Sequence, residues 1–429
     1  MIPEIKQRIE QIRRGEVPEG YKKTSVGIVP NDWKEYRLGD IYTERNEPGR
    51  NDLPILMVSI HSGVSDGEVD EEDMPKTVKR IEDKSAYKCA NSGDLVFNMM
   101  RAWQGAIGTV RTDGMVSPAY IVAKPNETVD PLFMDDYMKS SRMTYSIFRQ
   151  SYGVTDFRLR LYWDSFTPIE CTIPPISEQR KIVEIVSACD KVIELKQKLV
   201  DELKKLKKVC LAKMFPQEGE TVPEIRFPGF TAPWEQRKFS DLVLIERGGS
   251  PRPIDDYITD APDGLNWVKI GDAPEQGRYI TKTAEKIKPE GLSKTRQVQP
   301  GDLILSNSMS FGKPYIMGID GCIHDGWLLI RDTLNRFDLK FLCHMLGTNQ
   351  MLDQYKMFAA GSTVNNLNKE LVGNTTVSLP SIEEQRVVGA YLENIDNLIT
   401  LHQRELEEEQ RKKIALMQLL LTGVVRVQK

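Results

Sequence analysis

The sequence predicts an α+β protein in which one module is present twice and each copy ends in a long helix. The first observation is an ordered set of motifs: a tryptophan, a Gly-Asp-Leu turn, a glycine and a Pro-containing Glu-Gln-Arg segment recur in the same order. The two sets begin at Trp33 and Trp234, and matching positions lie 201 to 208 residues apart in a chain of 429 residues. A period of this size is far longer than a solenoid repeat and indicates two whole domains. The other observations are short alternating apolar segments within each copy and a heptad pattern after each.

Composition and charge narrow the possible classes of function. Hydrophobic residues make up 40% and charged residues 28% of the chain, which is typical of a globular protein. The formal net charge is −4, so any nucleic-acid-binding surface has to be a local patch. The six cysteines form no C-x-x-C pair and the four histidines have no metal-ligand spacing, which argues against a zinc site. Because no apolar run is long enough to span a membrane and no signal segment is present, we expect a cytoplasmic protein without a membrane partner.

The first copy is expected to begin with a short helix and to continue as a sheet domain. In residues 1–17, Ile5, Ile9 and Ile12 recur on one helical face, which predicts an amphipathic helix. In residues 18–175, short apolar segments separated by turn residues predict a curled, mostly antiparallel sheet with one helix. The expected strands are residues 53–60, 94–98, 107–111 and 119–123, and the expected helix is 131–149.

A long helix is expected over residues 176–216, after the first sheet domain. Its apolar residues alternate at three and four positions, which is a heptad pattern with one polar break at Lys196. The expected seam consists of Ile182, Ile185, Cys189, Val192, Lys196, Leu199, Leu203, Leu206 and Cys210. At ~1.5 Å per residue, 37 residues of this helix make a rod of roughly 55 Å.

The second copy repeats this plan. Residues 217–379 predict the second sheet domain and residues 380–425 the second long helix. The expected strands are 267–270, 302–306, 315–319 and 327–330, the expected helix is 338–357, and the seam is Val388, Tyr391, Ile395, Leu398, His402, Leu406, Leu416, Leu419 and Leu420. Two seams of equal length in one chain favour antiparallel packing of the two helices, with a coiled coil between two molecules as the alternative. The charged segment 407–413 is either a solvated face or a docking surface.

These motifs resemble a known family. The segments 174–180 (PPISEQR) and 379–386 (LPSIEEQR), each with its long helix, are similar to the conserved regions of type I restriction–modification specificity subunits, the HsdS family. Each follows a Gly-Asp-Leu turn and a glycine-containing loop, and the segment 116–120 (VSPAY) is also similar to that family. The resemblance covers nearly the whole chain. The loop 153–155 (GVT) departs from the Gly-Ser-Thr pattern seen at 361–363, which leaves the role of that first loop open.

The resemblance implies two target-recognition domains, each reading one half of a bipartite, asymmetric site on double-stranded DNA, and two helices that fix the spacer between the halves. It also implies partners: two methyltransferase subunits, which bind S-adenosylmethionine and methylate adenine, and restriction–translocase subunits. No cofactor is expected in this chain itself, and S-adenosylmethionine, ATP and magnesium are expected on the partner subunits.

A search for catalytic motifs supports a role without catalysis. The sequence contains no P-loop, dinucleotide-binding, nucleophile-elbow or zinc-protease motif, and no adenine-methyltransferase signature. Asp94 and Asp302 are conceivable nuclease carboxylates, but each lies in a Gly-Asp turn, where an aspartate commonly bonds to its own backbone. We therefore expect no catalytic residue and no metal site.

Candidate DNA-contacting residues are polar or basic residues on loops that follow the predicted strands. Arg and Lys can bind guanine edges or phosphates, Asn and Gln can pair with adenine, and Ser and Thr suit phosphates. The candidates are Arg101, Gln104, Thr155, Arg158 and Arg160 in the first copy and Asn307, Ser308, Ser310, Lys313, Ser362, Thr363, Asn365 and Asn366 in the second.

A second group of candidates serves the helix pair and the docking of partner subunits. It consists of Glu178, Gln179, Arg180, Ile182, Leu199, Leu203, Glu384, Gln385, Arg386, Ile395 and Leu398. Two other functions remain open: a scaffold whose helices bind proteins while its heads do not read DNA, and a nuclease or methyltransferase with an unrecognised site. Salt-dependent DNA binding separates them, because binding through phosphates weakens steeply with salt.

Overall fold

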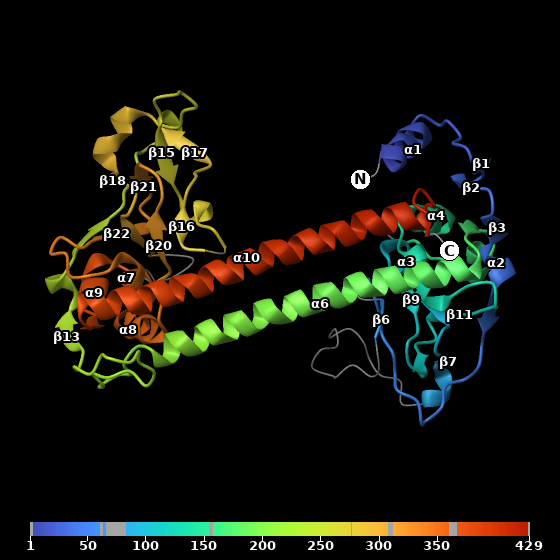
Figure 1. Ribbon diagram of the computed structural model, residues 1–429, viewed down its shortest axis with the longest axis horizontal. Helices are drawn as coiled ribbons and strands as arrows, with labels where there is room; N and C mark the ends of the chain where they lie inside the picture. The colour runs from blue at the N-terminus through green and yellow to red at the C-terminus, as the bar shows by residue number, and fades with distance from the viewer. Residues whose placement is uncertain are drawn as a thin grey trace. The chain divides into compact units, whose positions relative to one another are not determined.

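The computed structural model describes residues 3–60, 63–65, 83–153, 158–275, 277–307, 312–359 and 367–427. Helices and sheets are mixed along the chain (Figure 1), which confirms the predicted α+β class. The chain divides into two compact units, which we call unit 1 (Met1–Ile193 with Glu408–Lys429) and unit 2 (Glu194–Glu407). Within the described residues, no helix is long and apolar enough to cross a membrane.

Unit 1 is built on a four-stranded antiparallel sheet in the order β4-β11-β8-β9. These strands are β4 (Tyr42–Arg45), β11 (Tyr120–Pro125), β8 (Leu95–Asn98) and β9 (Ile107–Thr109). Smaller antiparallel pairs are β1 (Tyr21–Thr24) with β2 (Gly27–Pro30), β3 (Lys34–Arg37) with β12 (Glu170–Ile173), β5 (Val58–Ser59) with β6 (Gly63–Val64), and β7 (Lys88–Ala90) with β10 (Gly114–Val116).

Helices cover one face of the unit 1 sheet and bury its core. Phe97 of the sheet and Phe133 and Tyr137 of a covering helix are almost completely buried, and they belong to one apolar cluster. The helices of unit 1 outside the two long ones are α1 (Pro3–Arg13), α2 (Leu38–Ile41), α3 (Pro131–Met138), α4 (Ser141–Gln150) and α5 (Trp163–Phe166).

Unit 2 contains a five-stranded sheet in the order β14-β22-β19-β20-β16 and a four-stranded sheet in the order β17-β15-β21-β18. The strands are β14 (Leu244–Arg247), β22 (Trp327–Arg331), β19 (Leu303–Ser306), β20 (Pro314–Met317), β16 (Tyr279–Ile280), β17 (Glu285–Ile287), β15 (Leu265–Val268), β21 (Gly321–Ile323) and β18 (Arg296–Val298). A separate pair joins β13 (Glu235–Lys238) to β23 (Thr376–Leu379). All pairs between these strands are antiparallel except β15 with β21 and β16 with β20. The order β14-β22-β19-β20 corresponds to β4-β11-β8-β9 of unit 1.

Three sequence predictions of single elements were wrong. The expected helix 131–149 is two helices, because Ser140 has extended backbone angles and its Oγ accepts a hydrogen bond from the Met143 amide. The expected helix 338–357 is likewise α7 (Leu339–Leu346) and α8 (Asn349–Ala359), separated at Gly347 and Thr348, and α9 (Lys369–Gly373) follows later. The expected strand 53–60 is reduced to Val58–Ser59, since Pro54 has no amide hydrogen to donate to a ladder.

Two long helices contribute residues to both units. They are α6 (Ile176–Lys213), which is 38 residues long, and α10 (Ile382–Leu421), which is 40 residues long. In unit 1 the start of α6 packs beside the end of α10, and in unit 2 the end of α6 packs beside the start of α10, so each unit contains an antiparallel pair (Figure 1).

The buried seam departs from the predicted one at Val192, Leu199 and Leu206 of α6 and at Tyr391 and Leu398 of α10. Val192, Leu199 and Leu206 were expected inside, but their exposed fractions are 43%, 42% and 43%. One heptad series of buried or half-buried residues on α6 consists of Ile182, Val186, Cys189, Ile193, Lys196, Val200, Leu203, Lys207 and Cys210. The corresponding residues on α10 are Val388, Leu392, Ile395, Ile399, His402, Leu406, Glu409, Lys413 and Leu416, each 206 positions after its counterpart on α6. The two seams are therefore the same heptad pattern, and each includes at least one lysine.

Candidate nucleic-acid interface and helix anchors

The start of α6 is fixed to unit 1 through a buried carboxylate. Glu178 is 6% exposed and accepts hydrogen bonds from Trp33 Nε1 at 3.3 Å and from Arg426 Nε and Nη2 at 2.7 Å each. Arg426 also binds both carboxylate oxygens of Asp32, at 2.9 and 2.7 Å. Proximity to these carboxylates raises the pKa of Arg426, with the hydrogen bond to Glu178 as the largest cause. The segment after α10 therefore closes unit 1 onto the first turn of α6.

Unit 2 contains the same anchor at the start of α10. Glu384 is 2% exposed and accepts from Trp234 Nε1 at 3.3 Å and from Arg226 Nε and Nη2 at 2.7 and 2.8 Å. Arg226 lies in the segment after α6, as Arg426 lies in the segment after α10. In both units a tryptophan and an arginine thus donate hydrogen bonds to the glutamate at the start of one long helix. The arginine belongs to the segment that follows the other long helix.

The neighbouring glutamines complete each anchor. Gln179 Oε1 accepts from the Asp130 amide at 2.7 Å, and Gln179 Nε2 donates to the Thr128 carbonyl at 3.0 Å. In unit 2, Gln385 Oε1 accepts from the Asp338 amide at 2.9 Å, and Nε2 donates to the Arg336 carbonyl at 3.0 Å. Asp130 and Asp338 in turn cap the next helices, α3 and α7. Each glutamine thereby links a long helix to the sheet domain of its own unit.

The predicted docking set divides into buried and exposed residues. Glu178, Gln179, Ile182, Glu384, Gln385 and Ile395 are buried, and Leu203 is half-buried. Arg180 and Arg386 are exposed, as are Leu199 at 42% and Leu398 at 43%. The buried members hold the helices to their units, so only the exposed ones are accessible to another protein.

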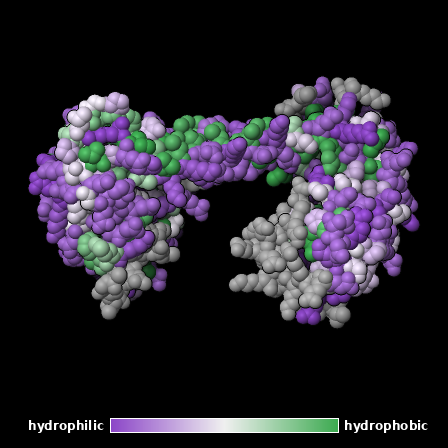
Figure 2. Space-filling view, turned by 90° about the horizontal axis from the view of Figure 1, so that it is seen from below, coloured by the Kyte–Doolittle hydropathy of each residue, from purple (hydrophilic) through white to green (hydrophobic). Residues whose placement is uncertain are grey.

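An exposed apolar stripe runs along α6 beside the buried seam. Leu195, Leu199, Leu206 and Val209 are 60%, 42%, 43% and 45% exposed, and their spacing of four, seven and three residues places them on one helical face. On α10, Leu398 and Leu401 are 43% and 50% exposed. Figure 2 shows apolar side chains gathered on the exposed surface of the helical segments. An exposed row of large aliphatic side chains is typical of a protein–protein interface.

Asp94 and Asp302 have the structural role that their turns predicted. Asp94 Oδ2 accepts from the Asn91 amide at 2.8 Å and from Arg45 Nε at 2.7 Å. Asp302 Oδ2 accepts from the Gln299 amide at 2.8 Å and from Arg331 Nη2 at 2.6 Å. Each carboxylate bonds to its own turn and to an arginine of another strand in the same sheet. Within the described parts of the chain, no group of three or more His, Cys, Asp and Glu side chains is placed to hold a metal ion.

The structure brings the candidate DNA-contacting residues of unit 1 close together. Arg101 and Gln104 lie in the turn after β8 and are exposed, and Arg158 and Arg160 are exposed on a second segment. The two segments meet where the Leu161 amide donates to the Met99 carbonyl at 2.9 Å. Thr155 lies outside the described residues. The resulting surface carries three arginines and one glutamine, which are side chains suited to phosphates and base edges.

In unit 2, the candidates differ in accessibility. Lys313 is exposed, and its ammonium lies 5.1 Å from the centre of the Tyr315 ring. Asn307 is only 1% exposed and its amide donates to the Asp325 carbonyl at 2.8 Å, so Asn307 supports the chain fold and was wrongly expected to contact DNA. The other candidates of unit 2 lie outside the described residues: Ser308, Ser310, Ser362, Thr363, Asn365 and Asn366.

Sequence reasoning missed the arginines that complete the two anchors. Arg226 and Arg426 lie at different distances beyond the ends of α6 and α10, so they fall outside the motifs that repeat at a constant spacing. The pairing of a buried glutamate with an arginine is a contact between residues far apart in sequence, and only the fold reveals it.

Comparison with known proteins finds a matching family model for part of the chain and two relatives that are similar over nearly its full length. Residues 232–409 match the family model of the type I restriction modification DNA specificity domain. Over 95% of this chain and 96% of the relative, the sequence is 24% identical to the type I restriction enzyme MjaVIII specificity subunit of Methanocaldococcus jannaschii. The putative type I restriction enzyme MjaX specificity subunit of the same organism is 23% identical over 95% of this chain and 97% of its own.

A solved structure has the same fold. It comes from a study of complex assembly and conformational transition of the type I R–M system. The two chains superpose with a TM-score of 0.58 at 21% identity, over 92% of this chain and 99% of that one.

Proposed function

We propose that this chain, which belongs to the HsdS family of type I restriction–modification specificity subunits, reads a bipartite DNA site with the sheet domain of each unit. The observation that carries the proposal is the repeated anchor, in which Glu178 and Glu384 tie two similar sheet domains to two long helices. Two similar domains in one chain suit a site with two separately read halves. The full-length match to named specificity subunits supports the same function.

The proposed contacts with DNA are made by exposed side chains on loops of the sheet domains. In unit 1 they are Arg101, Gln104, Arg158 and Arg160, which lie on two neighbouring segments. In unit 2 they include Lys313. Arginine and lysine supply sequence-independent phosphate contacts, and arginine and glutamine can also read base edges in the major groove.

The long helices have two proposed roles. Their common heptad seam, reinforced by the Lys207–Asp396 and Lys413–Asp190 ion pairs, favours a rigid pair that fixes the length of the DNA between the half-sites. The exposed stripe with Leu199 and Leu206 offers a docking face for methyltransferase subunits. Those subunits would bind S-adenosylmethionine and methylate adenine, and the restriction–translocase subunits would use ATP and magnesium, whereas this chain supplies recognition.

Methylation mapping and DNA binding test this proposal together. A tag on this chain allows purification of its complex from the native host, and filter binding to genomic fragments is then measured at several salt concentrations. We expect DNA binding that weakens steeply with salt. We also expect methylated adenines in a split motif, lost on deletion of the gene. A complex that forms but binds no DNA, in a host whose methylation is unaffected by the deletion, would instead support the protein scaffold.

A further inference from the structure

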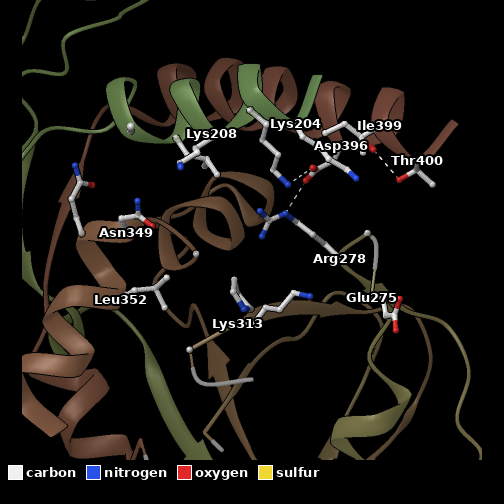
Figure 3. Close-up of a pocket in the computed structure, with 18 of the residues that line it drawn as sticks. Lys204, Lys208, Glu275, Arg278, Lys313, Asn349, Leu352, Asp396, Ile399 and Thr400 are labelled. Carbon is white, nitrogen blue, oxygen red and sulfur yellow. Dashed lines mark hydrogen bonds and ion pairs between the residues drawn. The ribbon is translucent and has the colours of Figure 1, made fainter. Parts of the chain in front are cut away.

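Unit 2 contains a cavity of about 890 Å³ between the long helices and the sheet domain. Lys204 and Lys208 line it from α6, Asp396 from α10, Arg278 from the segment before β16, and Lys313 from the position just before β20 (Figure 3). The cavity is far larger than one ion, and residues from several separate segments of unit 2 surround it.

The charges that line this cavity do not balance. Its lysines and arginine number five, and its carboxylates are Glu275 and Asp396. Asp396 is already shared by two cations, since it accepts from Arg278 Nε at 2.9 Å and pairs with Lys207. Lys204, Lys208 and Lys313 have no carboxylate partner among the described residues. The undescribed stretches next to the lining, residue 276 and residues 308–311, contain no Asp or Glu in sequence.

The internal repeat shows which of these lysines the helix pair requires. Lys207 pairs with Asp396 in unit 2, and its counterpart Lys413 pairs with Asp190 in unit 1, so this ion pair recurs in both units. The positions of unit 1 that match Lys204 and Lys208 are Gln410 and Ile414. The helix pair therefore packs in unit 1 without a cation at either position.

The arrangement of the unpaired lysines is unfavourable without an anion. Lys204 and Lys208 are four residues apart, on one face of α6, where two like charges repel. Asn349 and Gln350, the first residues of α8, also line the cavity, and the start of a helix carries a partial positive charge. A bound anion would offset both effects, whereas no described carboxylate of unit 2 pairs with Lys204 or Lys208.

We infer that this cavity binds phosphate groups of the DNA backbone, with Lys204 and Lys208 as the main contacts and Lys313 completing the site. This inference rests on the proposed function, and it makes α6 part of the DNA-binding surface instead of a spacer only. The backbone is the favoured source of phosphate because Lys313, which lines the cavity, is also the proposed DNA contact of unit 2 and is exposed. Such contacts add affinity without sequence preference.

The test compares the tagged complex carrying Lys204→Gln and Lys208→Gln with the unchanged complex. Binding to a labelled duplex is measured by fluorescence anisotropy between 0.05 and 0.3 M salt. Each lost phosphate contact reduces the slope of log affinity against log salt by about 0.9, which corresponds to roughly an eightfold weaker binding at ~0.1 M salt. We expect a slope reduced by about two and an equal loss of affinity for duplexes of any sequence. The methylated motif in the host should be unchanged.

The matched control is Lys205→Gln on the same helix. Lys205 is 72% exposed in its side chain, pairs with Glu202 at 2.9 Å and does not line the cavity, so the slope should stay as in the unchanged complex. An unchanged slope in the double variant would overturn the inference, provided that the unchanged complex binds DNA. A failure of the unchanged complex to bind DNA would instead refute the proposed function. A melting temperature raised by inorganic phosphate only when both lysines are present, with an unchanged DNA slope, would assign the cavity to a free anion and also overturn the inference.

Discussion

Arg426 donates two hydrogen bonds of 2.7 Å to Glu178, although 248 residues separate them in the chain. Glu178 is nearly inaccessible to water, so the arginine is its main source of positive charge. Arg226 and Glu384 have the same relationship in unit 2. The anchor of unit 1 therefore depends on the segment after α10, and the anchor of unit 2 depends on the segment after α6.

Removing the arginine should destabilise unit 1. In Arg426→Ala, Glu178 loses its cation but stays buried, and a broken buried pair costs about 3 kcal/mol at the lower end of the usual range. The lower end applies because the Arg426 side chain is 32% exposed and water can partly replace it. Urea unfolding followed by tryptophan fluorescence measures the change. Arg386→Ala, at an exposed arginine in the first turn of α10, is the control, and equal stability loss in both variants would contradict the anchor.

Replacing Arg226 should have at least as large an effect in unit 2. The Arg226 side chain is 12% exposed and that of Glu384 only 2%, so less water can reach the abandoned carboxylate in Arg226→Ala. The variant Glu384→Gln retains an acceptor and a shape close to the original, and it should lose less stability than Arg226→Ala. Limited proteolysis with mass spectrometry identifies which unit opens first, and earlier cleavage in unit 1 than in unit 2 would contradict the prediction.

Asp136 should make unit 1 less stable as the pH rises. Burial, followed by the nearby charge of Asp135, raises the pKa of Asp136 from 3.8 to about 6. A carboxyl group with a raised folded pKa stabilises the fold fully below pH 3.8, and this contribution is lost as the pH rises through 6. Asp136→Asn should therefore leave stability almost unchanged near pH 4 and increase it at pH 8, by at most about 3 kcal/mol. Melting temperatures of both proteins across this range decide the matter, and a gain in stability at pH 4 as large as that at pH 8 would rule out titration of Asp136.

The equivalent position in unit 2 provides a contrast of opposite sign. His344 lies 208 residues after Asp136 and is completely buried, and burial lowers its pKa from 6.5 to about 2. A histidine with a lowered folded pKa stabilises the fold above pH 6.5 and loses that contribution as the pH falls. The two units thus respond to acid in opposite directions at matching positions.

The two seams show how far the helices were predictable from sequence. Their length follows from the heptad spacing in both copies, and their antiparallel packing from the presence of two seams of equal length in one chain. Which residues face inward did not follow from the sequence, because α6 carries two apolar stripes that are one residue apart. The prediction took the stripe with Leu206 because it is more hydrophobic than the stripe with Lys207. The stripe with Leu206 is the exposed one. Lys207 is tolerated in the seam because Asp396 pairs with it. A lysine with a distant carboxylate partner has no local signature in the sequence.

The candidate site was predictable only in its exposed parts. Arg101 and Arg160 lie on exposed neighbouring segments, as their positions in predicted loops suggested. Asn307 also follows a predicted strand, but its side chain is buried and donates to the Asp325 carbonyl. The lysines of the cavity, Lys204 and Lys208, lie in a helix whose charged residues are expected to be solvated. Only the packing of α6 against the sheet domain places them together with Lys313.

Exchange of one sheet domain should change one half of the recognised DNA site. Replacing residues 220–379 with the matching segment of a relative leaves unit 1, Glu178 and Glu384 in place, and the new segment has to supply the counterparts of Arg226 and Trp234. Methylated adenines in a host lacking the original gene report the new motif. We expect one half-site to change while the other half-site is retained, and a change in both halves would refute independent reading by the two domains.

Lys313→Ala should weaken DNA binding without changing the motif. The ammonium lies over the Tyr315 ring and lines the cationic cavity, which suits a phosphate contact. The expected result is a uniform loss of affinity and a salt slope smaller by about 0.9. A motif relaxed at one position, with a loss of about 1–3 kcal/mol for that base, would instead show that Lys313 reads a base. The measurements are anisotropy titrations with specific and unrelated duplexes and methylation mapping in the host.

Lengthening both long helices should lengthen the DNA spacer. The Lys207–Asp396 and Lys413–Asp190 pairs set the antiparallel register, and insertions after Lys198 and after Arg404 lie at matched heights in that register. Four helix-forming residues at each point lengthen each helix by about 6 Å and rotate its seam by about 40°. This rotation is close to the twist between neighbouring base pairs in a duplex with ~10.5 base pairs per turn. Because the duplex rises about 3.4 Å per base pair, the methylated motif should gain one or two base pairs between unchanged half-sites. An insertion in one helix alone puts the seams out of register and should lower the melting temperature instead. Methylation at the original spacing by the doubly extended protein would show that the helices do not measure the gap.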